Sequence, residues 1–536
     1  MTGEHGAGGS VVIRDATIVD GTGAAGYPGD VVVEDGVIQA IAPPHSLSSD
    51  RISPRIDAGG LVVCPGFIDV HSHADEAPLL TEDDLAKISQ GVTTEVTGNC
   101  GTSLAPVAAN GDNEFLRSVC NAATFRYEHW RSVAELFTII DRRRGVTNSC
   151  PLIGHGELRL AVMGPVSREA TAEDVRAMGA LLAEGLEAGA FGMSTGLIYP
   201  PGLYSNTEEL AALAAYLPPG RVYATHMRNE GSGLLESIDE ALVIGRRAGC
   251  RVQISHLKSA GMSNWGGVAR ALEVLDAARA DGVPVTQDVY PYDAAATSMR
   301  VCLPPWVHDG GSGAMRRRLH DPSVLSELRR QVEEPADDAS WENIIASAGY
   351  ERIVVAAGDH RFAGMTLKHI ADHLQVEPFD ALIHVLMKED FDSVIAVFDM
   401  SEQDMETALR SPFTAIGSDG GTAVFGGLAH PRQYGTFPRL LGRYVRDRGV
   451  LDMPEAIRRM TSLPASIFGV PGRGTIAIGK VADLVCFDPA EIGHSGDFSN
   501  PAVPPTGIAW VMQAGHVAMR HGRWAGTRRG SRLVPE

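Results

Sequence analysis

The chain contains 536 residues, 44% of them hydrophobic, which is the composition of a globular protein too long for one compact core. Its 66 acidic and 46 basic residues give a formal net charge of −20, which disfavours nucleic acids and anionic membranes as partners because both attract basic surfaces. Seven scattered cysteines without a Cys-x-x-Cys pair, no signal-peptide pattern and no apolar run near the about 20 residues of a membrane span predict a reduced, cytoplasmic protein.

Both ends of the chain are rich in short β-strand patterns. β-Branched runs at 9–14 and 30–38 surround turn signals, and similar runs recur at 480–488 and 507–517. We therefore expect one small β-sandwich domain that both termini build together, from residues 1–64 and 470–536.

The middle of the chain alternates strand and helix patterns. Helix formers fill 171–188, 234–248 and 268–280, between apolar runs that end in polar residues. Eight such runs predict a TIM-type (β/α)8 barrel in the α/β class over residues 65–469. They lie at 67–71, 93–98, 151–155, 191–195, 222–226, 252–256, 283–290 and 414–419.

The gap between the seventh and eighth strand runs is too long for one crossover, so we expect a lid insertion at about 296–350. Further strand-like runs at 353–357 and 394–398 leave the barrel's strand count open by one or two. Five arginines of the insertion fit a solvated helix face, or alternatively an acidic substrate: Arg316, Arg317, Arg318, Arg329 and Arg330.

Several potential metal ligands follow the strand runs, where parallel barrels carry their chemistry. His71 and His73 stand at i and i+2 on an extended segment and therefore point to the same side. The complete set is His71, His73, Cys100, His155, His226, His256 and Asp419. Imidazole and thiolate together favour zinc, and a carboxylate is compatible with it. His155 is the least secure member, since it also fits a core position or a place beside the ligands.

Motifs along nearly the whole chain, from about residue 9 to 530, resemble the N-acyl-D-amino-acid deacylases (D-aminoacylases) of the amidohydrolase superfamily. A cysteine at position 100 narrows the resemblance to this family, because related cyclic amidases carry a carboxylated lysine in the barrel. The motifs are PGFIDVHSH (65–73), QGVTT (90–94), GNCG (98–101), GHGELR (154–159), STGLIYPP (194–201), THMRNE (225–230), SHLK (255–258), DVYPY (288–292), GSDG (417–420) and HPRQYGTFPR (430–439).

The resemblance implies roles for individual residues. Cys100, His226 and His256 would hold a tightly bound Zn2+, and His71, His73 and Asp419 would surround a second, weaker position. Asp419 would be the general base and acid, and Tyr199 would polarise the scissile carbonyl. Lys258, Tyr290 and Arg432 would bind the α-carboxylate of a small-molecule N-acyl amino acid substrate. Ala296 departs from the family pattern, where a serine is common, which leaves the side-chain preference open.

The predicted activity is zinc-dependent hydrolysis of N-acyl-D-amino acids to a carboxylate and a free D-amino acid. The preference for D substrates follows from the resemblance alone. The alternatives are another amidohydrolase activity (a dipeptidase, a cyclic amidase or a hydrolase of non-natural amides) and an inactive homologue that acts as a binding protein. No nucleic acid or membrane partner is expected, and a homo-oligomer is compatible with the sequence.

Overall fold

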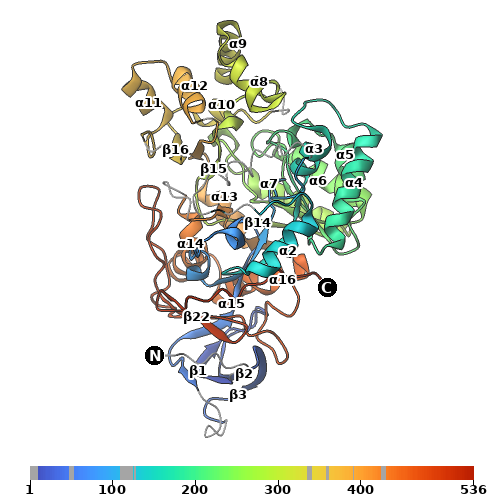
Figure 1. Cartoon of the computed structure of the whole chain (residues 1–536). Coiled ribbons are helices and arrows are strands. Elements are labelled where there is room, and N and C mark those ends of the chain that lie inside the picture. The colour runs from blue at the N-terminus through green and yellow to red at the C-terminus, as the bar shows by residue number, and fades with distance from the viewer. Residues whose placement is uncertain are drawn as a thin grey trace.

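The computed structural model describes residues 10–46, 54–108, 125, 128–334, 341–357, 361–389, 391–423 and 430–536. Three parts follow one another along the long axis of the molecule in Figure 1. A β domain lies at the end that carries β1–β3, the barrel forms the middle, and an insertion that includes α9 and α12 forms the opposite end. In the described residues no helix has the length and apolarity that a membrane crossing requires.

The β domain is built from both ends of the chain. Nine strands form one sheet in the order β23-β22-β21-β20-β5-β1-β2-β3, with β4 beside β1. The N-terminal strands are β1 (Val11–Ile18), β2 (Tyr27–Glu34), β3 (Val37–Ala42), β4 (Arg55–Asp57) and β5 (Val62–Pro65). The C-terminal strands are β20 (Leu484–Phe487), β21 (Ile508–Gln513), β22 (His516–Arg520) and β23 (Arg523–Trp524).

The strands from the two ends of the chain share one hydrophobic core. Antiparallel pairing of β5 with β20 joins the N-terminal strands to the C-terminal strands, and Ile13, Leu484 and Trp510 belong to the same buried cluster. The turn after β2 meets the turn after β21: Gly36 has φ +79°, and a Cβ there would lie 2.9 Å from the Ala514 carbonyl oxygen. Only glycine fits that position without strain. We propose that this domain comprises about 1–64 and 470–536.

Eight parallel staves form the barrel, at the eight positions that the strand runs predict. They are β6 (Phe67–Asp69), β8 (Val92–Thr97), β9 (Asn148–Pro151) continued by β10 (Ile153–Gly154), β11 (Gly192–Gly196), β12 (Val222–His226), β13 (Arg251–Ile254), β14 (Val285–Val289) and β18 (Thr414–Ile416). Parallel ladders connect β6-β8-β9 and β10-β11-β12-β13-β14-β18. The Leu152 N–H donates to the Thr97 carbonyl, which keeps β10 in line with β9.

The barrel closes between its last and first staves. The Asp419 N–H donates to the His71 carbonyl at 2.7 Å, and β19 (Gly420–Gly421) runs parallel to β7 (Ser72–His73). This short pairing brings the predicted His-x-His motif and Asp419 side by side at the carboxyl ends of the strands.

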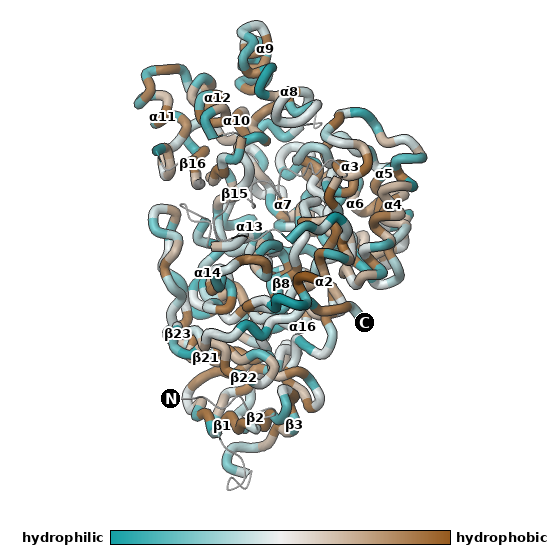
Figure 2. The backbone as a smooth tube through the Cα atoms, viewed as in Figure 1, coloured by the Kyte–Doolittle hydropathy of each residue, from teal (hydrophilic) through white to brown (hydrophobic). Residues whose placement is uncertain are grey.

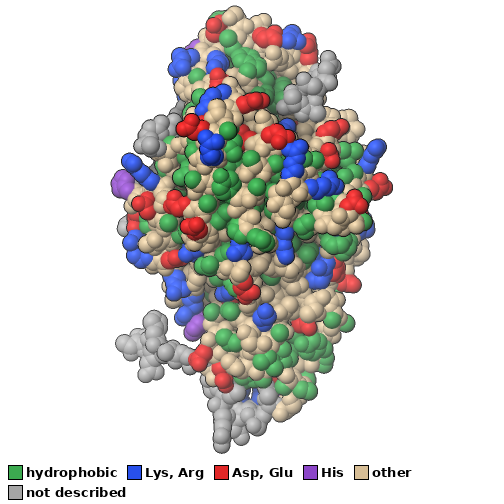
Figure 3. Space-filling view, turned by 90° about the vertical axis from the view of Figure 1, so that its right-hand side faces the viewer, with side chains coloured by type: hydrophobic (Ala, Val, Ile, Leu, Met, Phe, Trp, Pro, Cys, Tyr) green, Lys and Arg blue, Asp and Glu red, His purple; other side chains and the backbone are tan. Residues whose placement is uncertain are grey.

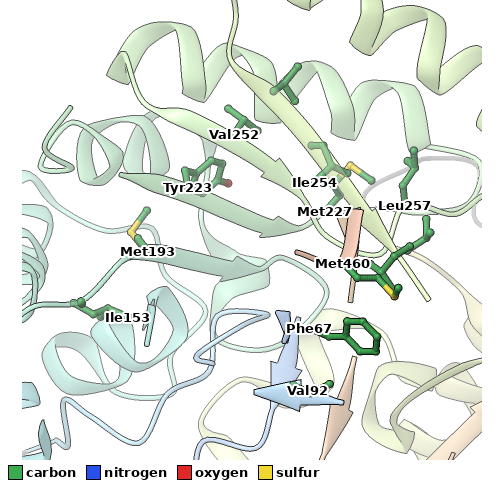
Figure 4. Packing of buried hydrophobic residues seen from close by; sticks show 14 of the residues in the cluster. Phe67, Val92, Ile153, Met193, Tyr223, Met227, Val252, Ile254, Leu257 and Met460 are labelled. Atoms are coloured by element: carbon green, nitrogen blue, oxygen red, sulfur yellow. The ribbon is translucent and has the colours of Figure 1, made fainter. Parts of the chain in front are cut away.

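A row of apolar side chains crosses neighbouring staves and packs outward against the helices. Ile153, Met193, Tyr223 and Val252 are register partners on β10 to β13, and all are buried (Figure 4). The helices over these staves are α3 (His155–Met163), α4 (Ala172–Glu187), α5 (Thr207–Ala214), α6 (Leu234–Ala248) and α7 (Gly267–Ala280). The remaining helices around the barrel are α2 (Val133–Arg143), α13 (Glu402–Arg410), α14 (Arg432–Arg439), α15 (Met453–Met460) and α16 (Ser462–Phe468). In Figure 2 hydrophobic stretches run along β1, β2 and β21, and hydrophobic residues alternate with hydrophilic ones along helices such as α4 and α5.

The insertion between β14 and β18 is longer than the predicted 296–350. Its strands β15 (Ala295–Ser298), β17 (Val394–Val397) and β16 (Ile353–Ala357) form a separate antiparallel sheet in that order. The strand-like runs at 353–357 and 394–398 therefore belong to the insertion, which extends to about residue 398. Its helices α8 (Gly311–Arg318), α9 (Pro322–Glu333), α10 (Ile344–Ala348), α11 (Leu367–Leu374) and α12 (Pro378–Lys388) contribute to its own buried core.

The arginines of the insertion mostly have local partners. Arg329 binds Asp380 at 2.6 Å and Arg330 binds Glu327 at 2.7 Å, both at the surface. Acidic and basic side chains alternate over the face that Figure 3 presents, without a large patch of one sign. The structure therefore favours the solvated helix face for Arg329 and Arg330.

Candidate active site

A cavity of about 780 Å3 lies between the carboxyl ends of the barrel strands and the insertion. Potential metal ligands line the side of the cavity that the barrel forms, and residues of β15, α8 and β17 line the side that the insertion forms. Its volume falls within the about 300–1,000 Å3 of sites that enclose drug-sized ligands.

Cys100, His226 and His256 bring three potential ligand atoms together at the bottom of this cavity. The Cys100 Sγ lies 3.7 Å from His226 Nδ1 and 3.6 Å from His256 Nε2, and all three side chains are buried. Ligand atoms of a tetrahedral zinc with bonds of about 2.0–2.3 Å lie about 3.3–3.8 Å apart. The distances and the donor types fit zinc, and three protein ligands leave a position for water or substrate.

A second group shares Cys100 with the first. The His71 Nε2 lies 3.3 Å from the Cys100 Sγ and 3.4 Å from the Asp419 Oδ1, and the His73 Nε2 lies 3.1 Å from the same oxygen. Ligand atoms of His71, His73, Cys100 and Asp419 all lie within 4.8 Å of one another. The five residues that the sequence predicts as metal ligands are therefore together, with Asp419 beside them.

Abrupt backbone turns aim three of these side chains inward. Cys100, His256 and Asp419 have φ values of 52°, 35° and 50°. Such left-handed conformations are uncommon outside glycine, and they concentrate at functional sites where the surrounding fold enforces them.

The histidines favour the thiolate form of Cys100. Burial alone would raise the pKa of the thiol, but His71, His226 and His256 surround it and hold that pKa well below its usual range. Because the thiolate is the form that binds metal, the pocket is prepared for a cation.

Glu230 connects the first ligand group to the predicted substrate residues. Its carboxylate lies 2.9 Å from His256 Nδ1, accepts a hydrogen bond from Lys258 Nζ at 2.7 Å, and lies 3.5 Å from His226 Nε2. Carboxylates in this position fix the tautomer and orientation of ligating histidines. Glu230 has no role predicted from the sequence, although it stands four residues after His226 in the THMRNE motif.

The predicted substrate-binding residues all line the cavity. The Arg432 guanidinium lies 4.6 Å from the centre of the Tyr290 ring, and its Nη1 lies 2.9 Å from Asp419 Oδ2. The Tyr290 hydroxyl donates to the Met400 sulfur at 3.4 Å. Lys258 adds a second cation to the same wall, so the cavity offers fixed positive charge beside the ligand groups.

Tyr199 also lines the cavity. Its hydroxyl lies 2.8 Å from the Thr297 hydroxyl of the insertion, and its ring packs edge-on against His226 with 5.0 Å between centroids. Burial raises the pKa of Tyr199 well above its usual value, so the phenol keeps its proton and can donate a hydrogen bond.

Comparison with known proteins identifies the family. A model of the amidohydrolase family matches residues 55–247 and 357–508. A D-aminoacylase and an N-acyl-D-aspartate deacylase of Alcaligenes xylosoxydans xylosoxydans are 33% and 34% identical, over 98% of this chain and 97% and 95% of their own lengths. The crystal structure of an N-acyl-D-glutamate deacylase from Bordetella bronchiseptica, with zinc and a phosphonate inhibitor, matches with a TM-score of 0.81 and 30% identity, over 98% of this chain and 99% of that one.

The chain belongs to the D-aminoacylase family of the amidohydrolase superfamily. The resemblance that the motifs indicate is thereby confirmed, as is the α/β barrel with an added domain.

His155 lies outside both ligand groups of this amidohydrolase. It begins α3, and its Nε2 contacts Glu209 Oε1 at 2.9 Å in a buried cluster that includes Arg159. Burial lowers the pKa of His155, which favours a neutral structural imidazole. Among the seven strand-end candidates, His155 is the one that belongs to neither ligand group.

Lys87 joins the two edges of the barrel seam beneath His71 and Asp419. Its ammonium donates to Asp69 Oδ2 and to Ser418 Oγ, both at 2.7 Å, and lies 3.3 Å from the Glu95 carboxylate. Lys87 is only 2% exposed. The sequence offered no signal for this role, because Lys87 and Ser418 stand 331 residues apart.

Proposed function

We propose that this amidohydrolase hydrolyses N-acyl-D-amino acids to a carboxylate and a free D-amino acid in a zinc-dependent reaction. The observation that carries the proposal is the group of Cys100, His226 and His256 at zinc distances, beside Asp419 and the cationic wall formed by Lys258, Tyr290 and Arg432. Relatives of this chain that are named for the same reaction support it. His71 and His73 would line a second, weaker metal position with Asp419.

Zinc held by Cys100, His226 and His256 would polarise the scissile carbonyl and lower the pKa of a bound water toward about 7. Asp419 then takes a proton from the attacking water. Burial would raise the pKa of Asp419, but Arg432, His71 and His73 hold it well below its usual range, so the residue begins as a carboxylate. Asp419 returns the proton to the leaving nitrogen, because an amine anion is a poor leaving group.

The cationic wall would bind the substrate's free carboxylate. Arg432 offers guanidinium N–H donors besides those directed at Asp419 and the Ala296 carbonyl, Lys258 offers a point charge and Tyr290 a phenol. Tyr199, whose ring packs against His226, would donate a hydrogen bond to the carbonyl oxygen as negative charge develops there. A fixed carboxylate and a polarised carbonyl together select a linear N-acyl amino acid over a cyclic amide.

The cellular location and the oligomeric state of the enzyme stay predictions. All six described cysteines are free and buried, which is compatible with the cytoplasmic location that we propose. A homo-oligomer is also proposed without a described interface to support it.

The test is a hydrolysis panel of N-acetyl-D- and N-acetyl-L-amino acids with the zinc-loaded enzyme. We expect release of the free amino acid from D substrates, and loss of activity in a Cys100→Ala variant. Cleavage confined to L substrates, or full activity of Cys100→Ala, would contradict the proposal.

A further inference from the structure

The walls of the cavity differ in character across the barrel mouth. Lys258, Tyr290 and Arg432 follow β13, β14 and β18, the sixth to eighth staves. The opposite side of an eight-stranded barrel belongs to the third and fourth staves, β10 and β11. Most of the lining there is apolar, with Leu160 and Pro165 after β10 and Ile198, Pro200 and Pro201 after β11, although Glu157 and Tyr199 also line this side.

The insertion extends the apolar wall. The Gly310 N–H donates to the Pro165 carbonyl at 2.8 Å, which docks the start of α8 on the loop after α3. Met315 of α8 is buried and lines the cavity above this contact. Leu160 and Ile198 remain only half-buried, so they keep apolar surface open to a ligand.

The covalent structure of an N-acyl amino acid determines which part of the substrate lies against the cationic wall and which part lies against the apolar wall. With the carboxylate held by Lys258 and Arg432, the Cα and the amino-acid side chain remain close to that wall, near Ala296, because Arg432 Nη2 donates to the Ala296 carbonyl at 3.3 Å. The carbonyl lies farther along the substrate, at the ligand group and Tyr199. The acyl tail, on the far side of that carbonyl, must continue away from the cations toward Leu160 and Ile198.

We propose that Leu160, Pro165, Ile198, Pro200 and Met315 form an apolar acyl subsite, and that the enzyme prefers medium-length aliphatic acyl groups to acetyl. This inference rests on the proposed function. An acetyl group leaves most of this wall in contact with water, whereas each further buried methylene favours binding by about two- to fourfold. The hydrophobic contribution is realised only if the tail lies along the wall.

Charged groups near the subsite disfavour an anionic tail. Glu157 of α3 lines the cavity on the same side as Leu160. On the insertion side, Arg300 lies 3.8 Å from Asp392, so its charge is balanced by a neighbour. We therefore expect neutral acyl chains to be hydrolysed faster than a succinyl group of similar length.

The experiment measures kcat/KM for N-acetyl, N-butanoyl, N-hexanoyl and N-succinyl derivatives of D-leucine and of D-glutamate with the zinc-loaded enzyme. Two amino acids separate the acyl preference from the side-chain preference. We expect at least a tenfold rise from acetyl to hexanoyl in both series, and a succinyl value below that of butanoyl.

A Leu160→Ser variant tests whether the preference for longer acyl groups arises at the proposed subsite. The hexanoyl-to-acetyl ratio should fall at least threefold, while Val162→Ser, a matched change on the same helix away from the cavity, should leave the ratio unchanged. A ratio near one in the unaltered enzyme, or equal ratios in both variants, would overturn the subsite even if Leu160→Ser proves unstable. Failure to hydrolyse any D substrate would overturn the proposed function as well, so the two failures are distinguishable.

Discussion

Replacement of Glu230 by glutamine should weaken zinc binding without removing a proposed ligand. Glu230 is 4% exposed, and its carboxylate contacts His256 Nδ1 at 2.9 Å and Lys258 Nζ at 2.7 Å. Loss of a carboxylate that orients a ligating histidine typically costs about 10–100-fold in metal affinity or activity. We therefore expect a zinc dissociation constant at least tenfold higher in Glu230→Gln.

The same change should also destabilise the fold. Removal of one partner from a buried ion pair costs about 3–5 kcal/mol, and the glutamine amide restores one hydrogen bond of about 1 kcal/mol. The free energy of unfolding of the zinc-free protein should therefore fall by about 2–4 kcal/mol, as measured by urea denaturation. Zinc affinity is measured separately, by competition with a chromophoric chelator.

Glu240→Gln is the matched control. Glu240 of α6 forms a largely buried pair with Arg228 at 3.0 Å, and neither residue belongs to the two ligand groups. We expect this variant to lose stability but to bind zinc as tightly as the unaltered enzyme. Equal zinc affinities of Glu230→Gln and Glu240→Gln would refute the role of Glu230 in orienting His256.

Three further changes test other parts of the structure. Lys87→Met leaves Asp69 and Glu95 without their buried cation and should lower the free energy of unfolding by about 3–5 kcal/mol in urea denaturation; a loss below about 1 kcal/mol would contradict the seam contact. Arg432→Lys removes the paired N–H donors and should raise KM for an N-acyl-D-amino acid about tenfold or more; an unchanged KM would separate Arg432 from carboxylate binding. Burial raises the pKa of Glu76 to about 8, so its folded-state proton stabilises the protein at low pH and this stabilisation is lost as pH rises toward 8. Relative to the unaltered protein, Glu76→Gln should therefore gain about 2–3 kcal/mol of unfolding free energy as pH rises from 5.5 to 7.5, and an equal difference at both pH values would contradict this assignment.

The barrel and most of the candidate site could be predicted because their signals are local. Each stave is an apolar run that ends in a polar residue, and parallel strands bring those ends to one mouth. Cys100, His226 and His256 could be found in this way, although they lie on three different staves. The extent of the insertion could not, because an apolar run such as 394–398 does not reveal whether it pairs within the barrel or with β15 and β16.

The roles of residues that act through partners distant in the sequence could not be predicted either. His155 occupies the expected strand end, but its pairing with Glu209 arises only when the fold brings the start of α3 next to the start of α5. Glu230 lies in a loop, and its contact with Lys258 arises only when β12 and β13 stand side by side. Lys87 and Ser418 meet because the barrel closes. Such contacts follow from tertiary structure, and no local pattern encodes them.

The central claim is that zinc at Cys100, His226 and His256 supports hydrolysis of one enantiomer. The most direct measurement adds zinc stepwise to the metal-free enzyme with a racemic N-acyl amino acid, and follows the released amino acid by chiral chromatography. We predict no release without zinc, then release of the D-amino acid alone, increasing with zinc bound to the chain. Release without metal, or equal release of both enantiomers, would contradict the account.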